Sequence, residues 1–160
     1  MSSLYRQNVG IMLIDKNNHI FVGQKNDVYG SWQMPQGGIE EKEEPLVAAL
    51  RELEEETGIV SSKVKFLTSS NRTFKYTIYK SEQDKRRRIN KKQYLGQEQR
   101  WFLFRFLGTD DDFNIYNEPC EFKAWCWVRY SQLSNIVTPF KKDIYMQVLE
   151  EFEHFFTYST

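Results

Sequence analysis

The chain has 160 residues, of which 22 are Lys or Arg and 22 are Asp or Glu, so its formal net charge at pH 7 is zero. This length favours a single domain over residues 1–160 with a sizeable core, and the balanced charge provides no overall attraction to nucleic acid or membranes. Cys120 and Cys126 are too few for a disulfide scaffold, and no apolar run approaches the roughly 18 residues of a membrane span, so we expect a cytoplasmic protein with no membrane partner.

Apolar and alternating runs predict strands before and after a central helix. A turn at residues 15–18 follows the first strand, and a loop at 26–30 follows the second. The runs that predict strands are 9–13, 20–23, 64–67, 73–79, 100–107 and 122–130. Helical apolar spacing predicts helices from Pro45 to the residue before Gly58 and over 141–156. This order indicates an α/β fold in which a sheet lies between helices on its two faces.

The first helix carries consistent signals at its start, its buried face and its end. Pro45 suits a first helical turn, and Gly58 stands where a left-handed residue would end the helix. Glu43 and Glu44 lie where the helix dipole favours negative charge. The apolar stripe that predicts the buried face consists of Leu46, Ala49, Leu50 and Leu53.

Three glutamates share the opposite face of this helix. Glu52, Glu55 and Glu56 are spaced i, i+3, i+4, so their like charges repel one another. A solvated acidic surface is one explanation. A bound cation would make the arrangement favourable, and carboxylates suit hard cations such as Mg²⁺ or Mn²⁺. We therefore predict a divalent-metal site on this face.

Residues 37–59 resemble the Nudix box. The residues at the fixed positions of that motif are Gly37, Glu43, Arg51, Glu52, Glu55, Glu56 and Gly58, with Leu53 and Ile59 at its hydrophobic positions. The resemblance covers nearly the whole chain and implies a Nudix-type α/β/α sandwich with a mixed sheet between helices. It also implies a hydrolase that cleaves a diphosphate linkage in derivatives of nucleoside diphosphates.

The resemblance implies roles for residues of the box. The carboxylates that match the metal ligands of the family are Glu52, Glu55 and Glu56, and the catalytic base is one of them or a carboxylate outside the box. Arg51 is similar to the arginine that orients an acidic side chain, with an exposed ion pair to Glu55 as the alternative. Gly37 and Gly38 match the loop that approaches metal and phosphate, with a simple turn as the alternative.

Segments outside the box resemble one branch of the family, which contains the bacterial RNA pyrophosphohydrolases and the dinucleoside polyphosphate hydrolases. These segments span residues 5–10, 30–38, 96–103 and 140–145. Arg6 and Lys141 match basic residues that face the polyphosphate or the RNA 5′ end, and Phe140 matches an aromatic that packs against a base. The alternatives are a solvated arginine, a helix-start lysine and a core phenylalanine. Glu121 resembles a fourth metal-binding carboxylate, with a surface position at a strand edge as the alternative.

The segment from Lys80 to Lys92 carries seven bases and two acids. Such charge runs are usually solvated loops, and we expect a loop here. Because this segment lies between two strands of a protein that resembles a polyphosphate enzyme, phosphate contact by Lys85 to Lys92 is the second interpretation.

The leading functional hypothesis is a metal-dependent pyrophosphohydrolase that removes pyrophosphate from the 5′-triphosphate end of RNA, the step that initiates mRNA decay. Hydrolysis of a dinucleoside polyphosphate, such as diadenosine tetraphosphate, is the alternative within the same class. A catalytically inactive nucleotide-binding module is the alternative from another class, and the complete set Glu52, Glu55 and Glu56 argues against it.

Overall fold

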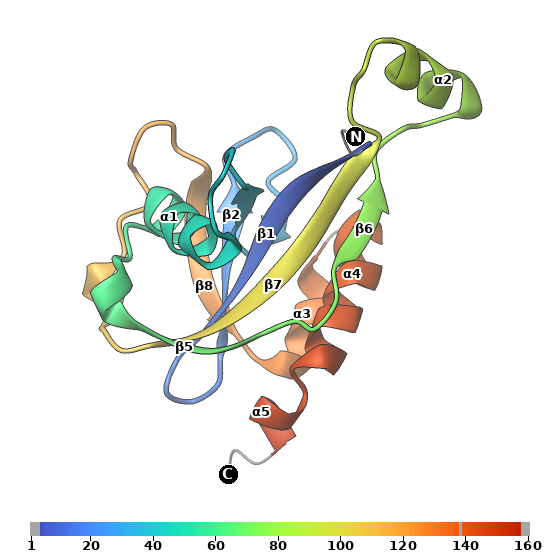
Figure 1. The fold of residues 1–160 in the computed structure, drawn as a ribbon. Helices are drawn as coiled ribbons and strands as arrows, with labels where there is room; N and C mark the ends of the chain where they lie inside the picture. Colours follow the sequence, from blue (N-terminus) through green and yellow to red (C-terminus); the bar gives the residue numbers. More distant parts are fainter. Residues whose placement is uncertain (1–3, 138, 158–160) are drawn as a thin grey trace.

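In the computed structural model, residues 4–137 and 139–157 are described, apart from the side chains of Phe140 and Thr157, and they form a mixed sheet of eight strands with helices on both faces (Figure 1). The strands are β1 (Tyr5–Ile14), β2 (Ile20–Lys25), β3 (Trp32–Gln33), β4 (Gln36–Gly38), β5 (Val64–Ser69), β6 (Phe74–Thr77), β7 (Gly96–Phe106) and β8 (Phe122–Val128). Their order is β3-β2-β1-β7-β5, with β4 on β1, β6 on β7 and β8 on β2. The parallel pair β1 and β7 forms the centre, where Tyr5 lies opposite Gly96 and Ile14 opposite Arg105.

Helices cover the two faces of this sheet. The α-helices are α1 (Pro45–Thr57), α2 (Glu82–Asn90), α3 (Leu133–Ile136), α4 (Pro139–Glu151) and α5 (His154–Thr157), and 3₁₀ turns span Ser61–Lys63, Asp110–Asp112 and Tyr130–Gln132. In Figure 1, α1 packs on one face of the sheet and α3 and α4 pack on the other, while α2 stands apart from the sheet. None of the helices in residues 4–137 and 139–157 combines the length and the apolar character of a membrane span.

Alternation along the central strands divides the core between the two faces. One layer joins β1 and β7 to α1, and its members include Val9, Ile11, Leu13, Phe102, Phe104, Ala48, Ala49 and Leu53. The other layer joins the same strands to α4, and its members include Met12, Ile14, Trp101, Leu103, Ile144, Tyr145, Val148 and Phe152. Because successive side chains on a strand point to opposite faces, β1 and β7 are buried on both sides. The predicted sandwich is confirmed.

The boundaries of α1 agree with the sequence prediction. Pro45 is the first helical residue, and Gly58 follows the helix with φ 78°, its N–H donating to the carbonyl of Glu54 at 2.8 Å. Leu53 is fully buried, whereas Leu46 and Leu50 are partly buried against the same core layer. The acidic face of α1 lies outside this apolar layer.

The expectation of a loop at Lys80–Lys92 was wrong, because α2 occupies most of this segment. The Ser81 hydroxyl accepts a hydrogen bond from the Asp84 N–H at 3.0 Å, which caps the helix start. The Asp84 carboxylate in turn contacts Arg87 at 3.3 Å and Arg88 at 3.1 Å one turn later. Local capping and ion pairs thus support a helix that has no buried residue.

Candidate active site

Carboxylates from two separate parts of the chain surround one depression. Glu52, Glu55 and Glu56 come from the second half of α1, and Glu121 stands immediately before β8. The depression has a volume of about 480 Å³, and the residues that line it are Glu52, Glu54, Glu55, Glu56, Asn117, Glu118, Pro119 and Glu121. The structure therefore brings Glu121 to the acidic face of α1, across more than 60 residues of sequence.

Glu56 is the most buried of these carboxylates, with 8% of its surface exposed. Burial and the nearby charges of Glu121 and Glu52 raise its pKa well above the usual range. The backbone N–H of Gln36 donates a hydrogen bond to it, but its Oε2 atom has no hydrogen-bond partner among the described residues. A buried, unsatisfied and repelled carboxylate oxygen is costly unless a cation or proton meets it.

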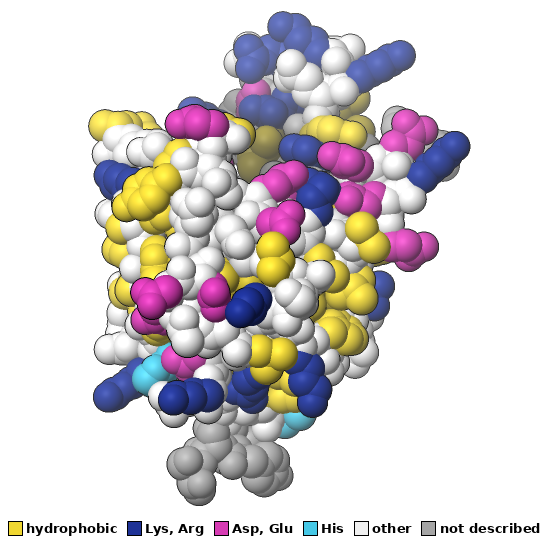
Figure 2. Space-filling model, turned by 90° about the vertical axis from the view of Figure 1, so that its left-hand side faces the viewer, with side chains coloured by type: hydrophobic (Ala, Val, Ile, Leu, Met, Phe, Trp, Pro, Cys, Tyr) yellow, Lys and Arg dark blue, Asp and Glu magenta, His cyan; other side chains and the backbone are white. Residues whose placement is uncertain are grey.

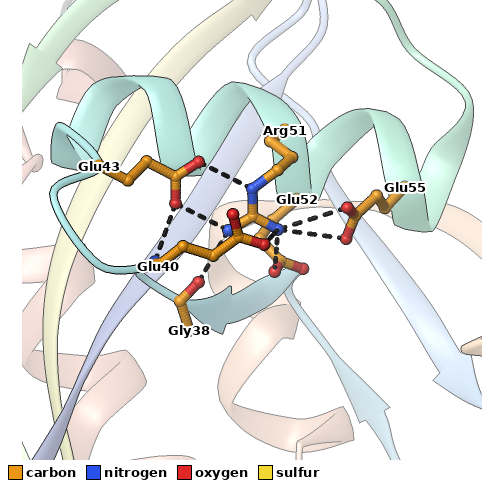
Figure 3. A network of polar contacts seen from close by, with 6 residues as sticks. All are labelled: Gly38, Glu40, Glu43, Arg51, Glu52 and Glu55. Atoms are coloured by element: carbon orange, nitrogen blue, oxygen red, sulfur yellow. Dashed lines mark hydrogen bonds and ion pairs between the residues drawn. The ribbon is translucent and has the colours of Figure 1, made fainter.

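Arg51 lies between the acidic residues of the loop and those of the helix (Figure 3). Its guanidinium donates to both carboxylate oxygens of Glu43 at 2.8 and 2.9 Å and to the carbonyl oxygen of Gly38 at 2.9 Å. It also donates to Glu52 Oε1 at 2.9 Å and to Glu55 at 3.3 Å. These contacts raise the pKa of Arg51 and, with the N–H of Glu40, lower that of Glu43 to about 2. The contact between Arg51 and Glu55 is therefore one of several hydrogen bonds made by Arg51 and not an isolated surface ion pair.

Gly37 and Gly38 leave room for two charged side chains. They lie on β4, where they pair with Val9 and Asn8 of β1. A Cβ atom on Gly37 would lie 1.9 Å from Cδ of Glu52, and one on Gly38 would lie 2.2 Å from Nη2 of Arg6. Only residues without a side chain therefore permit the Glu52 carboxylate and the Arg6 guanidinium to approach this backbone.

We expect Gly37→Ala to reduce activity far more than stability. The added methyl group would displace the carboxylate of Glu52, which is the far end of a flexible side chain and can move at little cost. A displacement of about 1 Å in an active site can lower the rate by roughly 10²-fold. Steady-state kinetics and the thermal midpoint would be measured together. A variant with a normal rate would show that the position of Glu52 is unimportant.

Lys141 approaches the same site from α4. Its Nζ donates to the side-chain oxygen of Gln33 at 2.7 Å. Burial and the charge of Lys25 lower its pKa to about 8, while the charges of Glu56 and Glu121 act in the opposite direction. The exposed Arg6 of β1 lies near Glu52, whose own pKa is raised by burial. The predicted contact of Phe140 with a base concerns a side chain outside the described part of the structure.

A buried polar network beneath β4, the strand that carries Gly37 and Gly38, was not predicted. The side-chain amide nitrogen of Gln99 donates to Asn8 and to Gln36, each at 2.8 Å. Asn8 is 2% exposed and Gln99 is 1% exposed. Because the N–H of Gln36 meets Glu56, this network fixes the backbone that holds that carboxylate. Asn8 and Gln99 lie in polar stretches of β1 and β7, so no sequence pattern distinguishes them from their neighbours.

The residues of this depression fit a divalent cation by their chemistry. Within residues 4–137 and 139–157, no three Asp, Glu, His or Cys side chains converge as a ready set of ligands. Arg51 holds Glu52 and Glu55 in their present orientations. Six of the eight lining residues are nevertheless glutamates, and Oε2 of Glu56 is buried without a partner in the described chain. Hard cations prefer such oxygen ligands.

Comparisons with known proteins identify the family of the chain and several relatives. Residues 4–148 match the NUDIX domain. The chain is 46% identical over 149 residues to an RNA pyrophosphohydrolase from Zymomonas mobilis, covering 92% of this chain and 94% of that protein. It is 43% identical over 150 residues to an RNA pyrophosphohydrolase from Roseobacter denitrificans, covering 93% and 92%. A crystal structure of a C. elegans Ap4A hydrolase binary complex is similar in fold, with a TM-score of 0.69, 18% identity and coverage of 94% and 96%.

Proposed function

The chain belongs to the Nudix hydrolase family, and we propose that it is an RNA pyrophosphohydrolase, which removes pyrophosphate from the 5′-triphosphate end of RNA. The observation that carries this proposal is the identity of more than 40% to RNA pyrophosphohydrolases over nearly the whole length of both chains. The acidic depression beside Arg6 and Lys141 supports the same chemistry, because it combines carboxylates with cations that suit a polyphosphate.

We propose that Glu52, Glu55 and Glu56, with Glu121 as a fourth carboxylate, would hold Mg²⁺ or Mn²⁺. Such a cation supplies charge neutralisation of the phosphates, which would otherwise be repelled by the glutamates. Members of this family are typically dependent on divalent metals. Because Oε2 of Glu56 has no hydrogen-bond partner in the described chain, a ligand there would remove an unfavourable feature of the metal-free protein.

The remaining residues of the site position the reactants. Arg51 would set the orientation of Glu52 and Glu55 through its contacts to Glu43 and the Gly38 carbonyl. One of the four glutamates of the cluster would accept the proton of the attacking water. Arg6 and Lys141 would contact the negative charges of the substrate on either side of the carboxylates.

We expect hydrolysis to require a divalent metal. Triphosphorylated RNA should release pyrophosphate in Mg²⁺ or Mn²⁺, lose this activity in excess chelator and regain it when metal is added back, because the glutamates and the polyphosphate repel one another without a cation. Release of labelled pyrophosphate measures the reaction. Full turnover in chelator would exclude the metal-dependent mechanism.

The same assay distinguishes the alternative substrate and the inactive module. Diadenosine tetraphosphate is tested beside triphosphorylated RNA at matched metal and salt concentrations. A higher kcat/KM for the dinucleotide would replace the RNA assignment with a dinucleoside polyphosphate hydrolase. Absence of turnover of either substrate, together with retained nucleotide binding, would indicate a module without catalysis.

A further inference from the structure

Helix α2 carries a cluster of positive charges that lies outside the core and does not line the acidic depression. The segment Lys80–Lys92 has a net charge of +5, so the rest of this neutral chain is net negative. No residue of α2 is buried, and therefore core packing does not explain its composition. Lys and Arg side chains gather at the end of the molecule where α2 stands (Figure 2). Lys80 and Arg87 are exposed and line a hollow beside α2.

Three neighbouring hollows connect α2 with the end of β4. The first, of about 540 Å³, is lined by Arg6, Tyr94 and the loop Ile39–Glu43, whose three glutamates make this hollow acidic. The second, of about 530 Å³, shares Arg6 and Tyr94 and adds Arg88. The third, of about 420 Å³, shares Arg88 and continues along α2. Because each hollow shares lining residues with the next, they form one surface track from β4 to α2.

The side chains of the second and third hollows suit a single nucleic-acid strand. Arg6, which lies against Gly38, stands at the end of the track nearest the carboxylates. Tyr94 is 50% exposed, so its ring is available to a base. Arg88 donates to Asp84 and to the carbonyl of Tyr94, which joins α2 to the wall of the track. Cations beside an exposed aromatic ring are the features that single-stranded nucleic acid requires.

We propose that α2 and this track bind the phosphate backbone of single-stranded RNA downstream of the 5′ end, so that long transcripts are used more efficiently than short ones. This inference rests on the proposed function for the identity of its ligand. The track leads away from the site where the triphosphate end would be held, and only a substrate with several nucleotides reaches α2. RNA is therefore favoured over an acidic protein partner, which would have no reason to contact Arg6 beside Gly38.

The test compares two substrate lengths in the α2 variant Lys80→Gln/Arg87→Gln, whose two residues are exposed and line the third hollow. Glutamine retains helix propensity and removes one charge at each exposed position. Each phosphate contact on a single strand contributes about −0.7 to the slope of log affinity against log salt, so loss of two contacts should flatten the slope by about 1.4. For a triphosphorylated single strand of about 20 nucleotides, kcat/KM near physiological salt should fall roughly tenfold. For a triphosphorylated dinucleotide it should change by less than about twofold, because few phosphates extend beyond the site.

The matched control is Lys16→Gln/Lys65→Gln. Both lysines are exposed, Lys16 lies in the β1–β2 turn, and Lys65 pairs with Arg105 near the end of β7 opposite to Gly96. This control should retain wild-type kinetics on the long RNA. Equal losses in the control and in the α2 variant, or equal losses on both RNA lengths, would overturn the inference.

Binding of a 5′-monophosphorylated strand, measured by fluorescence anisotropy, provides a readout that does not need catalysis. Weaker binding by the α2 variant, but not by the control, would support RNA binding along the track. This holds even if the wild type hydrolysed neither the long nor the short triphosphorylated RNA. That second result would refute the proposed function and leave the binding inference standing. Competition by a polyglutamate peptide as strong as that by unlabelled RNA would instead assign α2 to an acidic protein and overturn the inference.

Discussion

Replacing Glu56 with glutamine should lower kcat by roughly 10²-fold or more, the scale of losing one important electrostatic group in an active site. Glutamine has nearly the same shape, so Gln36 keeps a hydrogen-bond acceptor and the fold is retained. What disappears is the charge that would hold the cation and, with it, the phosphates. Steady-state kinetics at saturating metal measures this loss.

The same substitution should stabilise the protein when metal is absent. Glu56 is buried, is repelled by Glu121 and Glu52, and leaves Oε2 without a partner in the described chain. Removing this charge should raise the free energy of unfolding by about 1 kcal/mol. Added metal should then stabilise the wild type but not Glu56→Gln, because ligand binding stabilises only the form that binds it.

Glu44→Gln serves as the control, because Glu44 is exposed at the start of α1 and its side chain makes no capping bond. It should retain the wild-type rate and the wild-type response to metal. A Glu56→Gln variant that matched this control in both measurements would show that the acidic depression is not the active site.

Arg51→Lys should lower both the rate and the stability. Lysine keeps the positive charge, but a single ammonium cannot donate at once to Glu43, Gly38, Glu52 and Glu55. We expect a loss of roughly 10²-fold in kcat, because Glu52 and Glu55 would lose their orientation. The lost hydrogen bonds between charged groups should also lower the free energy of unfolding by about 2 kcal/mol.

Arg105→Lys separates these two effects. Arg105 is partly buried and donates to the carbonyl of Asp15 and to Asn18, each at 2.6 Å, at the far end of β7. This control should lose stability and keep its rate. Equal loss of rate in both variants would mean that the rate of Arg51→Lys merely reflects a weakened fold.

The stability difference between wild type and Arg51→Lys should also depend on pH. The pKa of Glu43 is lowered to about 2 by Arg51 and by the N–H of Glu40, against an unperturbed value of 4.5. A carboxylate with a lowered pKa stabilises the folded state above its unfolded pKa, and this contribution is lost as the pH falls toward the folded pKa. The difference should therefore be complete above about pH 5 and shrink between there and about pH 2. Denaturant titrations across this range would measure it.

The elements that the sequence predicted correctly are those with strong periodicity and local end signals. Pro45, Gly58 and the apolar stripe between them define α1 without tertiary information. β7 begins at Gly96, before the predicted residue 100, because the polar stretch 96–99 pairs with β1 and β6. The loop that contains Gly37 and Gly38 includes the short strand β4, because pairing with β1 orders residues that carry no strand signal in the sequence.

The misassigned helix shows a different limit. Lys80–Lys92 has no apolar stripe, so periodicity could not indicate a helix. Ser81 followed three residues later by Asp84 was the available signal, and it matches a helix start. For the site, the spacing on α1 grouped Glu52, Glu55 and Glu56, but only a resemblance linked Glu121 and Lys141 to them. The amides Gln36 and Gln99 carry no motif and become visible only through the contacts that the fold creates.

The parallel pairing of β1 with β7 has a consequence for how the protein is made. Gln7 of β1 contacts Glu98 of β7, which is 91 positions later in the chain. At ribosomal speeds of about 5–20 residues per second, the first strand therefore waits roughly 5–20 seconds for its partner. During this interval its apolar residues, Val9 to Ile14, are without their final cover, and such distant pairings fold slowly. When every residue of α1 has been synthesised, the nascent chain still lacks β7, the strand that completes the centre of the sheet. Activity can therefore arise only late in synthesis.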